Sequence, residues 1–192
     1  PSDSVHETLV LFRKNPVVTS IVGDEISAAP IAWQYEHDET IAGILLELMR
    51  AGVIQSFVTE AELKRLQVGG RRFVERSARE KYPDAIITIG GPTASVRIAL
   101  ELELSRKDPK RYRQCLDAYA SRKDVDRVIF VARAGIVFES LKRAMRETYY
   151  PDWERPIGFG QLDDWKKNPL TAAIQFSESK TTMSAIHEGL AA

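Results

Sequence analysis

An alternation of apolar and polar residues from Ser95 to Ser105 constrains the fold of this chain more than any other feature. Every second side chain is apolar, and the positions between them carry arginine, alanine, glutamate and serine. A β-strand places successive side chains on opposite faces, so this period of two predicts a strand with one apolar face. Glu101 and Glu103 then share the other face.

The segments around this strand predict a mixture of strands and helices. The apolar periods and the Gly and Pro breakers indicate two kinds of element. We expect strands at Asp84–Ile89, Arg127–Ala132 and Pro156–Gln161, with a turn at Gly90–Pro92. We expect helices from Asp38 to Gly52, from Thr59 to just before Gly69, from Asp108 to about Ser121, at Gly135–Glu147 and at Leu162–Lys167. This order predicts an α/β fold with a mixed central sheet flanked by helices.

The length of 192 residues favours one domain with one sizeable core. Residues 1–36 show no clear pattern and are expected to form an N-terminal segment of uncertain structure. Residues 37–176 carry all the strong periodic signals and form the expected domain. Residues 177–192 are polar and poor in core-forming side chains, which favours a flexible tail.

Composition excludes several classes of protein. Lys and Arg together number 27, as do Asp and Glu, so net charge gives no argument for nucleic acid and only local clusters can. Cys115 is the only cysteine, which excludes an internal disulfide and a cysteine-based zinc site. No apolar run approaches a membrane span, and the first residues do not resemble a signal peptide. The expected location is the cytoplasm, with no membrane partner.

Three carboxylates form the candidate catalytic centre. Asp84 begins one strand, and Glu101 and Glu103 lie near the end of its hairpin partner, so the three fall roughly opposite one another. Hard oxygen ligands of this kind hold Mg²⁺ or Mn²⁺ in phosphodiester hydrolysis. An equally good interpretation from spacing alone is that both glutamates face solvent on the polar side of a half-buried strand.

Pro83-Asp84 followed by Glu101-Leu102-Glu103 resembles the signature of the PD-(D/E)XK nucleases. The resemblance implies a restriction-endonuclease-like core in which Asp84 and Glu101 bind the metal. The last signature position is usually lysine, and here it is Glu103. The water-activating role is therefore open between Glu103 and Lys107, which could reach back from the start of the next helix.

A closer resemblance, to the replication-relaxation family, spans roughly residues 37–132. It is carried by His37-Asp38, Thr59–Leu63, Tyr82–Ala85 and the run from Ala99 to Tyr112, with Tyr119 beyond. That family includes MobC-type mobilisation relaxases, whose members commonly add a winged-helix segment that this sequence does not show. The resemblance implies a nicking activity at a transfer origin, with DNA and other relaxosome proteins as partners.

The remaining candidate residues have ordinary structural explanations as well. Glu60 is a possible fourth acidic catalytic residue, but a glutamate at a helix start also favours the helix dipole. A basic segment follows Glu103, and such residues can bind DNA phosphates or form a solvated helix face. The expected DNA-binding residues are His37, Arg106, Lys107, Lys110, Arg111, Tyr112, Gln114 and Tyr119. Both tyrosines are also suited to core or groove packing.

The sequence therefore predicts a metal-dependent DNA endonuclease or nickase that acts in plasmid or integrative-element mobilisation. One alternative is a DNA-binding scaffold or replication-control protein that keeps a nuclease fold without turnover. Glu103 at the usual lysine position favours that alternative. Another is a transposon-end or junction-cleaving nuclease of the same fold.

Overall fold

The computed structural model describes residues 28–68, 81–90, 94–120, 122–148, 156–176 and 179–191. The chain divides into two compact units, Pro1–Gln34 and Tyr35–Ala192, close to the boundary expected after residue 36. Most of the expected N-terminal segment and the expected Gly90–Pro92 turn beyond Gly90 lie outside the described residues. The description below concerns the second unit.

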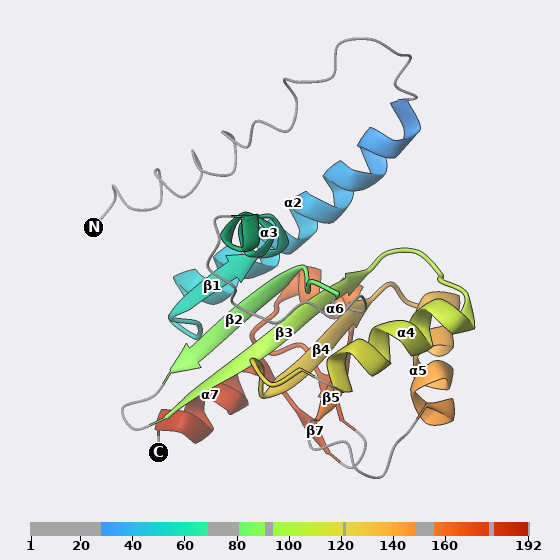
Figure 1. The fold of residues 1–192 in the computed structure, drawn as a ribbon. Helices are drawn as coiled ribbons and strands as arrows, with labels where there is room; N and C mark the ends of the chain where they lie inside the picture. Colours follow the sequence, from blue (N-terminus) through green and yellow to red (C-terminus); the bar gives the residue numbers. More distant parts are fainter. Residues whose placement is uncertain are drawn as a thin grey trace. The chain divides into compact units, whose positions relative to one another are not determined.

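Strands and helices alternate through most of this unit (Figure 1). The strands are β1 (Ser56–Thr59), β2 (Ala85–Gly90), β3 (Ser95–Glu103), β4 (Arg127–Ala132), β5 (Ile157–Gln161), β6 (Ile174–Gln175) and β7 (Lys180–Thr181). The helices are α2 (Ala28–Arg50), α3 (Glu60–Val68), α4 (Pro109–Ala120), α5 (Ile136–Glu147), α6 (Leu162–Lys167) and α7 (Met183–Ala191). Among them, no helix is both long and apolar enough to cross a membrane.

The strands form one mixed seven-stranded sheet in which each strand pairs with the next along the chain. β1, β2 and β3 are antiparallel neighbours, and Ala85 pairs with Leu100. β3, β4 and β5 are parallel, with α4 and α5 as their connections, and β6 and β7 return to antiparallel pairing. The predicted α/β fold with a mixed sheet flanked by helices is confirmed.

Helices cover both faces of the sheet. The two parallel crossovers advance in the same direction, and since such connections share one handedness, α4 and α5 lie on the same face. Their buried side chains form one core cluster with β4, whereas α2, α6 and α7 contribute to a second cluster on the opposite face. A parallel strand such as β4 is therefore buried on both sides and apolar at nearly every position.

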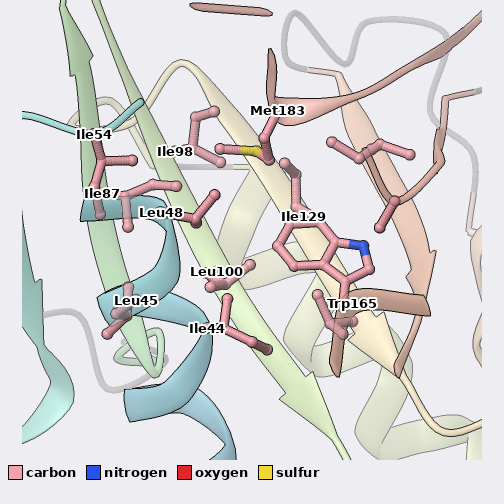
Figure 2. Packing of buried hydrophobic residues seen from close by; sticks show 14 of the residues in the cluster. Ile44, Leu45, Leu48, Ile54, Ile87, Ile98, Leu100, Ile129, Trp165 and Met183 are labelled. Atoms are coloured by element: carbon pink, nitrogen blue, oxygen red, sulfur yellow. The ribbon is translucent and has the colours of Figure 1, made fainter. Parts of the chain in front are cut away.

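The core beneath α2 is built from branched aliphatic side chains around one tryptophan. Figure 2 shows Leu45 and Leu48 of α2 packed against Ile87 and Leu100 of the sheet, with Trp165 farther along. Each fully buried side chain of this size contributes about 1.5 to 3 kcal/mol. The apolar side chains of α2 that pack here end just before its last residue, Arg50. Gly52, with a φ of 69°, then turns the chain away from the helix.

Strand β5 carries two glycines where large side chains approach its backbone. A Cβ at Gly158 would lie 2.6 Å from Ile174 and 2.8 Å from Phe176. A Cβ at Gly160 would overlap the indole nitrogen of Trp165, which is fully buried. The glycines therefore create the space into which α6 and β6 pack.

Three expectations need correction. Residues 179–191 are not a loose tail, because they form β7 and α7, and Met183 and Ile186 are buried in the core. α2 begins ten residues before the expected Asp38, at Ala28, since Pro30 lies in its first turn, where proline is tolerated. β1, β6 and β7 were not expected, because strands of two to four residues show no readable period.

Candidate functional site

The β2–β3 hairpin brings Asp84, Glu101 and Glu103 together. Asp84 directly precedes β2, and the pairing of Ala85 with Leu100 places it beside the end of β3. Oδ2 of Asp84 accepts the backbone N–H of Leu102 at 2.7 Å. Because Leu102 lies between the two glutamates in the strand, the aspartate carboxylate is held beside the part of β3 that carries Glu101 and Glu103.

Glu101 and Glu103 point toward α4 and are only 1% and 2% exposed. The alternation in β3 correctly separated two faces. The interpretation that the glutamates face solvent is wrong, because α4 and α5 cover the face that carries them. Burying an ionised carboxylate is costly unless it is paired and hydrogen-bonded, so both residues need specific partners.

Glu101 accepts hydrogen bonds at both carboxylate oxygens. The Lys81 ammonium donates to Oε2 and the Tyr119 hydroxyl donates to Oε1. Burial raises the pKa of Glu101 to about 7, although the charge of Lys81 and both hydrogen bonds oppose that rise. Tyr119 is itself held by an edge-on contact with Phe130, at 5.9 Å between ring centroids.

Glu103 forms an ion pair with Lys107, which lies in the loop that leads from β3 into α4. The lysine is positioned through its backbone, because its N–H donates to the hydroxyl of Tyr112 at 3.2 Å. Lys107 does reach back to the carboxylates, as expected from the sequence. It is paired with the same glutamate that competes with it for the water-activating role.

Helix α2 closes the site on the side of Asp84. Nε2 of His37 lies 3.2 Å from Oδ2 of Asp84, and Glu36 contacts Arg133 at 2.5 Å. The hydrogen bond with Asp84 raises the pKa of His37 to about 9, against the effect of burial. Burial opposes the ionisation of Asp84, but His37 and the Leu102 N–H outweigh it and lower its pKa.

The sequence interpretation did not identify Lys81 or Arg122. The carbonyl oxygen of Lys81 accepts a hydrogen bond from Nη1 of Arg122 at 2.9 Å. Arg122 is fixed in turn by two bonds to Asp124, at 2.8 and 2.6 Å. The position of Lys81, three residues before Asp84, was the only signal for its role, because its partners are distant in the sequence.

We call Asp84, Glu101 and Glu103, together with the side chains that bind them, the carboxylate cluster. Its negative and positive charges are equal in number. Three cationic side chains, His37, Lys81 and Lys107, face the three carboxylates. In this arrangement, no three His, Cys, Asp or Glu side chains of the described residues are placed to hold one metal ion together. The donor set nevertheless fits a hard cation, since all three candidate ligands are carboxylates.

Other expected residues lie outside the cluster. Glu60 contributes its backbone N–H to the carbonyl oxygen of Asp84 at 3.0 Å, but its carboxylate pairs with Lys64 at 2.7 Å and is 40% exposed. A water-activating or metal-binding role for Glu60 would require its side chain to leave Lys64. Cys115 is buried beside Glu101, and burial raises its pKa to about 12, so it remains a thiol.

Of the eight expected DNA-binding residues, His37 and Lys107 pair with carboxylates of the cluster, and the other six divide into two groups. The exposed group lies on α4 and the loop before it, and comprises Arg106, Lys110, Arg111 and Gln114. Tyr112 and Tyr119 are each 1% exposed, and the structure corrects their assignment as DNA-contacting residues. Both tyrosines turn inward because α4 packs on β3 and β4, and both serve the carboxylate cluster as hydrogen-bonding groups.

The part of the chain that the structure describes is thus an α/β protein with an open, mixed sheet and a buried cluster of ion pairs at one end of β3. No protein-family model, curated protein or solved structure compared with the chain matches it significantly.

Proposed function

We propose that this protein is a metal-dependent DNA endonuclease or nickase of the PD-(D/E)XK type, with a restriction-endonuclease-like core. One observation carries the proposal: Asp84 is hydrogen-bonded to the backbone of β3 between Glu101 and Glu103, so the three acidic residues lie at the end of one hairpin. Their sequence spacing resembles the nuclease signature, and the mixed sheet flanked by helices agrees with the fold that the resemblance implies. Mobilisation of a plasmid or integrative element is the setting that the replication-relaxation resemblance favours.

In this proposal each group of residues has one task. The three carboxylates would hold Mg²⁺ or Mn²⁺, and a divalent ion there would activate water and stabilise negative charge on the phosphate. The exposed cations of α4 bind the DNA backbone beside the cluster. Tyr119 and the Leu102 N–H orient Glu101 and Asp84, so that the carboxylates are preorganised on rigid elements.

The decisive experiment is nicking of supercoiled plasmid DNA with Mg²⁺, with Mn²⁺ and with EDTA. The wild-type protein should relax the plasmid only when metal is present. Asp84→Asn should abolish this activity, whereas Asp163→Asn, an exposed aspartate of α6, should retain it as a matched control. Relaxation that persists in EDTA, or in Asp84→Asn with its fold intact, would exclude the proposed centre.

Two single variants decide whether Glu103 or Lys107, which form one ion pair, activates the water. If Glu103 acts as the base or as a ligand, Glu103→Gln should lower turnover at least tenfold and weaken metal binding. If Lys107 acts instead, Lys107→Met should be the more damaging change and should leave metal affinity unchanged. Wild-type turnover in both variants would exclude both roles.

A DNA-binding scaffold without turnover is the second candidate function. The observation that favours it is the balance of charge, because the lysines of the protein itself already neutralise Glu101 and Glu103. The same assay distinguishes the two functions. A scaffold would bind DNA with equal affinity in metal and in EDTA and would leave supercoiled plasmid intact.

A further inference from the structure

Lys81 lies outside every motif discussed above, yet its ammonium donates to the buried Glu101 carboxylate. Its side chain is 31% exposed, whereas that of Glu101 is 2% exposed. The lysine of this ion pair is therefore partly exposed, while the glutamate is enclosed. The ammonium also lies 5.8 Å from the centre of the Tyr119 ring, whose hydroxyl binds the same glutamate.

The backbone of Lys81 is fixed independently of its side chain. Arg122 donates to the Lys81 carbonyl oxygen and is clamped by Asp124, and the side chains of this arginine and aspartate are only 13% and 19% exposed. Because the backbone is anchored, we expect only the side chain of Lys81 to move when its ammonium leaves Glu101.

Both oxygens of Glu101 accept a hydrogen bond, and a cation that binds this carboxylate would lie close to one of the two donors. Tyr119 cannot withdraw easily, because it is 1% exposed and its ring packs against Phe130. Lys81 can withdraw, since its four-carbon stem is flexible and its side chain is 31% exposed. An ammonium and a divalent ion on one carboxylate would also repel each other.

We propose that Lys81 is a further residue of the site, a displaceable cation that neutralises Glu101 until a divalent metal ion binds and that then faces the DNA phosphate, with Arg122 as its positioning residue. This inference rests on the proposed nuclease function. It assigns the phosphate-facing cation of the site to a residue that precedes Asp84, outside the signature.

The test is the affinity for Mn²⁺, measured by calorimetry without DNA, for the wild type, Lys81→Met, Lys81→Arg and Lys166→Met. Removing the competing ammonium should tighten Mn²⁺ binding in Lys81→Met by roughly tenfold or more, since tenfold corresponds to only about 1.4 kcal/mol. Lys81→Arg keeps a cation and should bind like the wild type. Lys166, an exposed lysine of α6, is the control for a general change in charge.

An affinity in Lys81→Met equal to or weaker than that of the wild type would overturn the proposal. Thermal melts identify a variant that fails to fold, and Lys81→Gln then repeats the test with a polar side chain. Arg122→Gln should loosen the lysine and tighten Mn²⁺ binding by a smaller factor. Unchanged binding in a folded Arg122→Gln protein would remove its positioning role.

DNA binding supplies a second readout. The measured quantity is the slope of the logarithm of DNA affinity plotted against the logarithm of salt concentration. In Ca²⁺, this slope should be shallower in Lys81→Met than in the wild type by roughly 0.9, the value of one phosphate contact. In EDTA, the two proteins should have the same slope. A slope unchanged in Ca²⁺ would overturn the contact with phosphate.

These outcomes separate the inference from the function on which it rests. If the wild type nicks DNA but Lys81→Met binds Mn²⁺ no more tightly, the nuclease function stands and the role of Lys81 is rejected. If the wild type neither binds Mn²⁺ nor nicks DNA, but Lys81→Met binds Mn²⁺, the competition by Lys81 stands and the nuclease function is rejected.

Discussion

Glu101 and Glu103 show how two glutamates of one strand can be buried beneath a helix. Each receives a lysine from a loop, Lys81 from before β2 and Lys107 from after β3. Removing one partner of such a pair leaves a buried charge and typically costs about 3 to 5 kcal/mol. The stability of the cluster therefore depends on keeping every charge matched.

The ion pair of His37 and Asp84 should make stability depend on pH. The pKa of His37 is raised from 6.5 to about 9, so its contribution is complete below pH 6.5 and is lost as the pH rises through about 9. The pKa of Asp84 is lowered from 3.8, so its contribution is present above pH 3.8 and is lost as the pH falls further. The pair should therefore stabilise the protein fully between pH 3.8 and pH 6.5, and less as the pH rises toward 9.

We therefore expect His37→Gln to lower the free energy of unfolding by about 1 to 2 kcal/mol at pH 7 and by almost nothing at pH 10. Urea denaturation in EDTA at both pH values measures the difference and keeps metal out of the comparison. A difference between variant and wild type that is the same at pH 7 and pH 10 would contradict the assignment.

Gly160 should tolerate no side chain. Gly160→Ala would drive a methyl group into the buried indole of Trp165, and overpacking of this kind costs about 1 to 3 kcal/mol. Gly43→Ala is the matched control, because Gly43 lies in α2 with open space around its Cβ position. That change should stabilise the protein by up to about 1 kcal/mol. Equal effects in the two variants, by urea denaturation, would refute the packing argument.

At the scale of elements, α4 joins the candidate site to the candidate DNA surface. Its inner face carries Tyr112 and Tyr119, and its outer face carries Lys110 and Arg111. Both faces follow from the packing of one amphipathic helix on β3 and β4. A DNA strand bound along the outer face would lie one helix diameter or less from the carboxylates.

Replacing Lys110 and Arg111 together by alanine should weaken DNA binding at low salt and make the salt slope shallower by roughly 1.8, or about 0.9 per phosphate contact. Lys166 and Lys167 form the control pair, since they are exposed on α6 on the opposite face of the sheet. Fluorescence anisotropy across a salt series measures both. Equal slopes in the two double variants would place DNA elsewhere.

Elements with a strong period and the short helix α6 were predictable, whereas the strands of two to four residues were not. The alternation in β3, the apolar run of β4 and the short helix α6 were all recognised close to their observed bounds. The same alternation could not show that α4 would cover the acidic face, because a period separates faces without saying what packs on them. The partners of Lys81 were hidden for the same reason, since only the folded sheet brings them together.

At the scale of the whole molecule, the last helix belongs to the core. Met183 is fully buried against the α2 face of the sheet, so Met183→Ala should cost about 2 to 5 kcal/mol. Glu188→Ala, an exposed position of the same helix, should change stability by about 0.5 kcal/mol or less. Thermal denaturation compares the two. A Met183→Ala protein as stable as the wild type would restore the expectation of a loose tail.

The order of the strands in the sheet bears on how this chain assembles as the ribosome makes it. Because every strand from β1 to β7 pairs with the one before it, each newly synthesised strand finds its partner already present. Pairing between neighbours in the chain closes connections of at most 25 residues, the number between Thr59 and Ala85, and such connections lose less entropy than pairings between distant strands. The sheet can therefore grow from its first strand to its last, with β3 and its acidic residues enclosed only when α4 emerges.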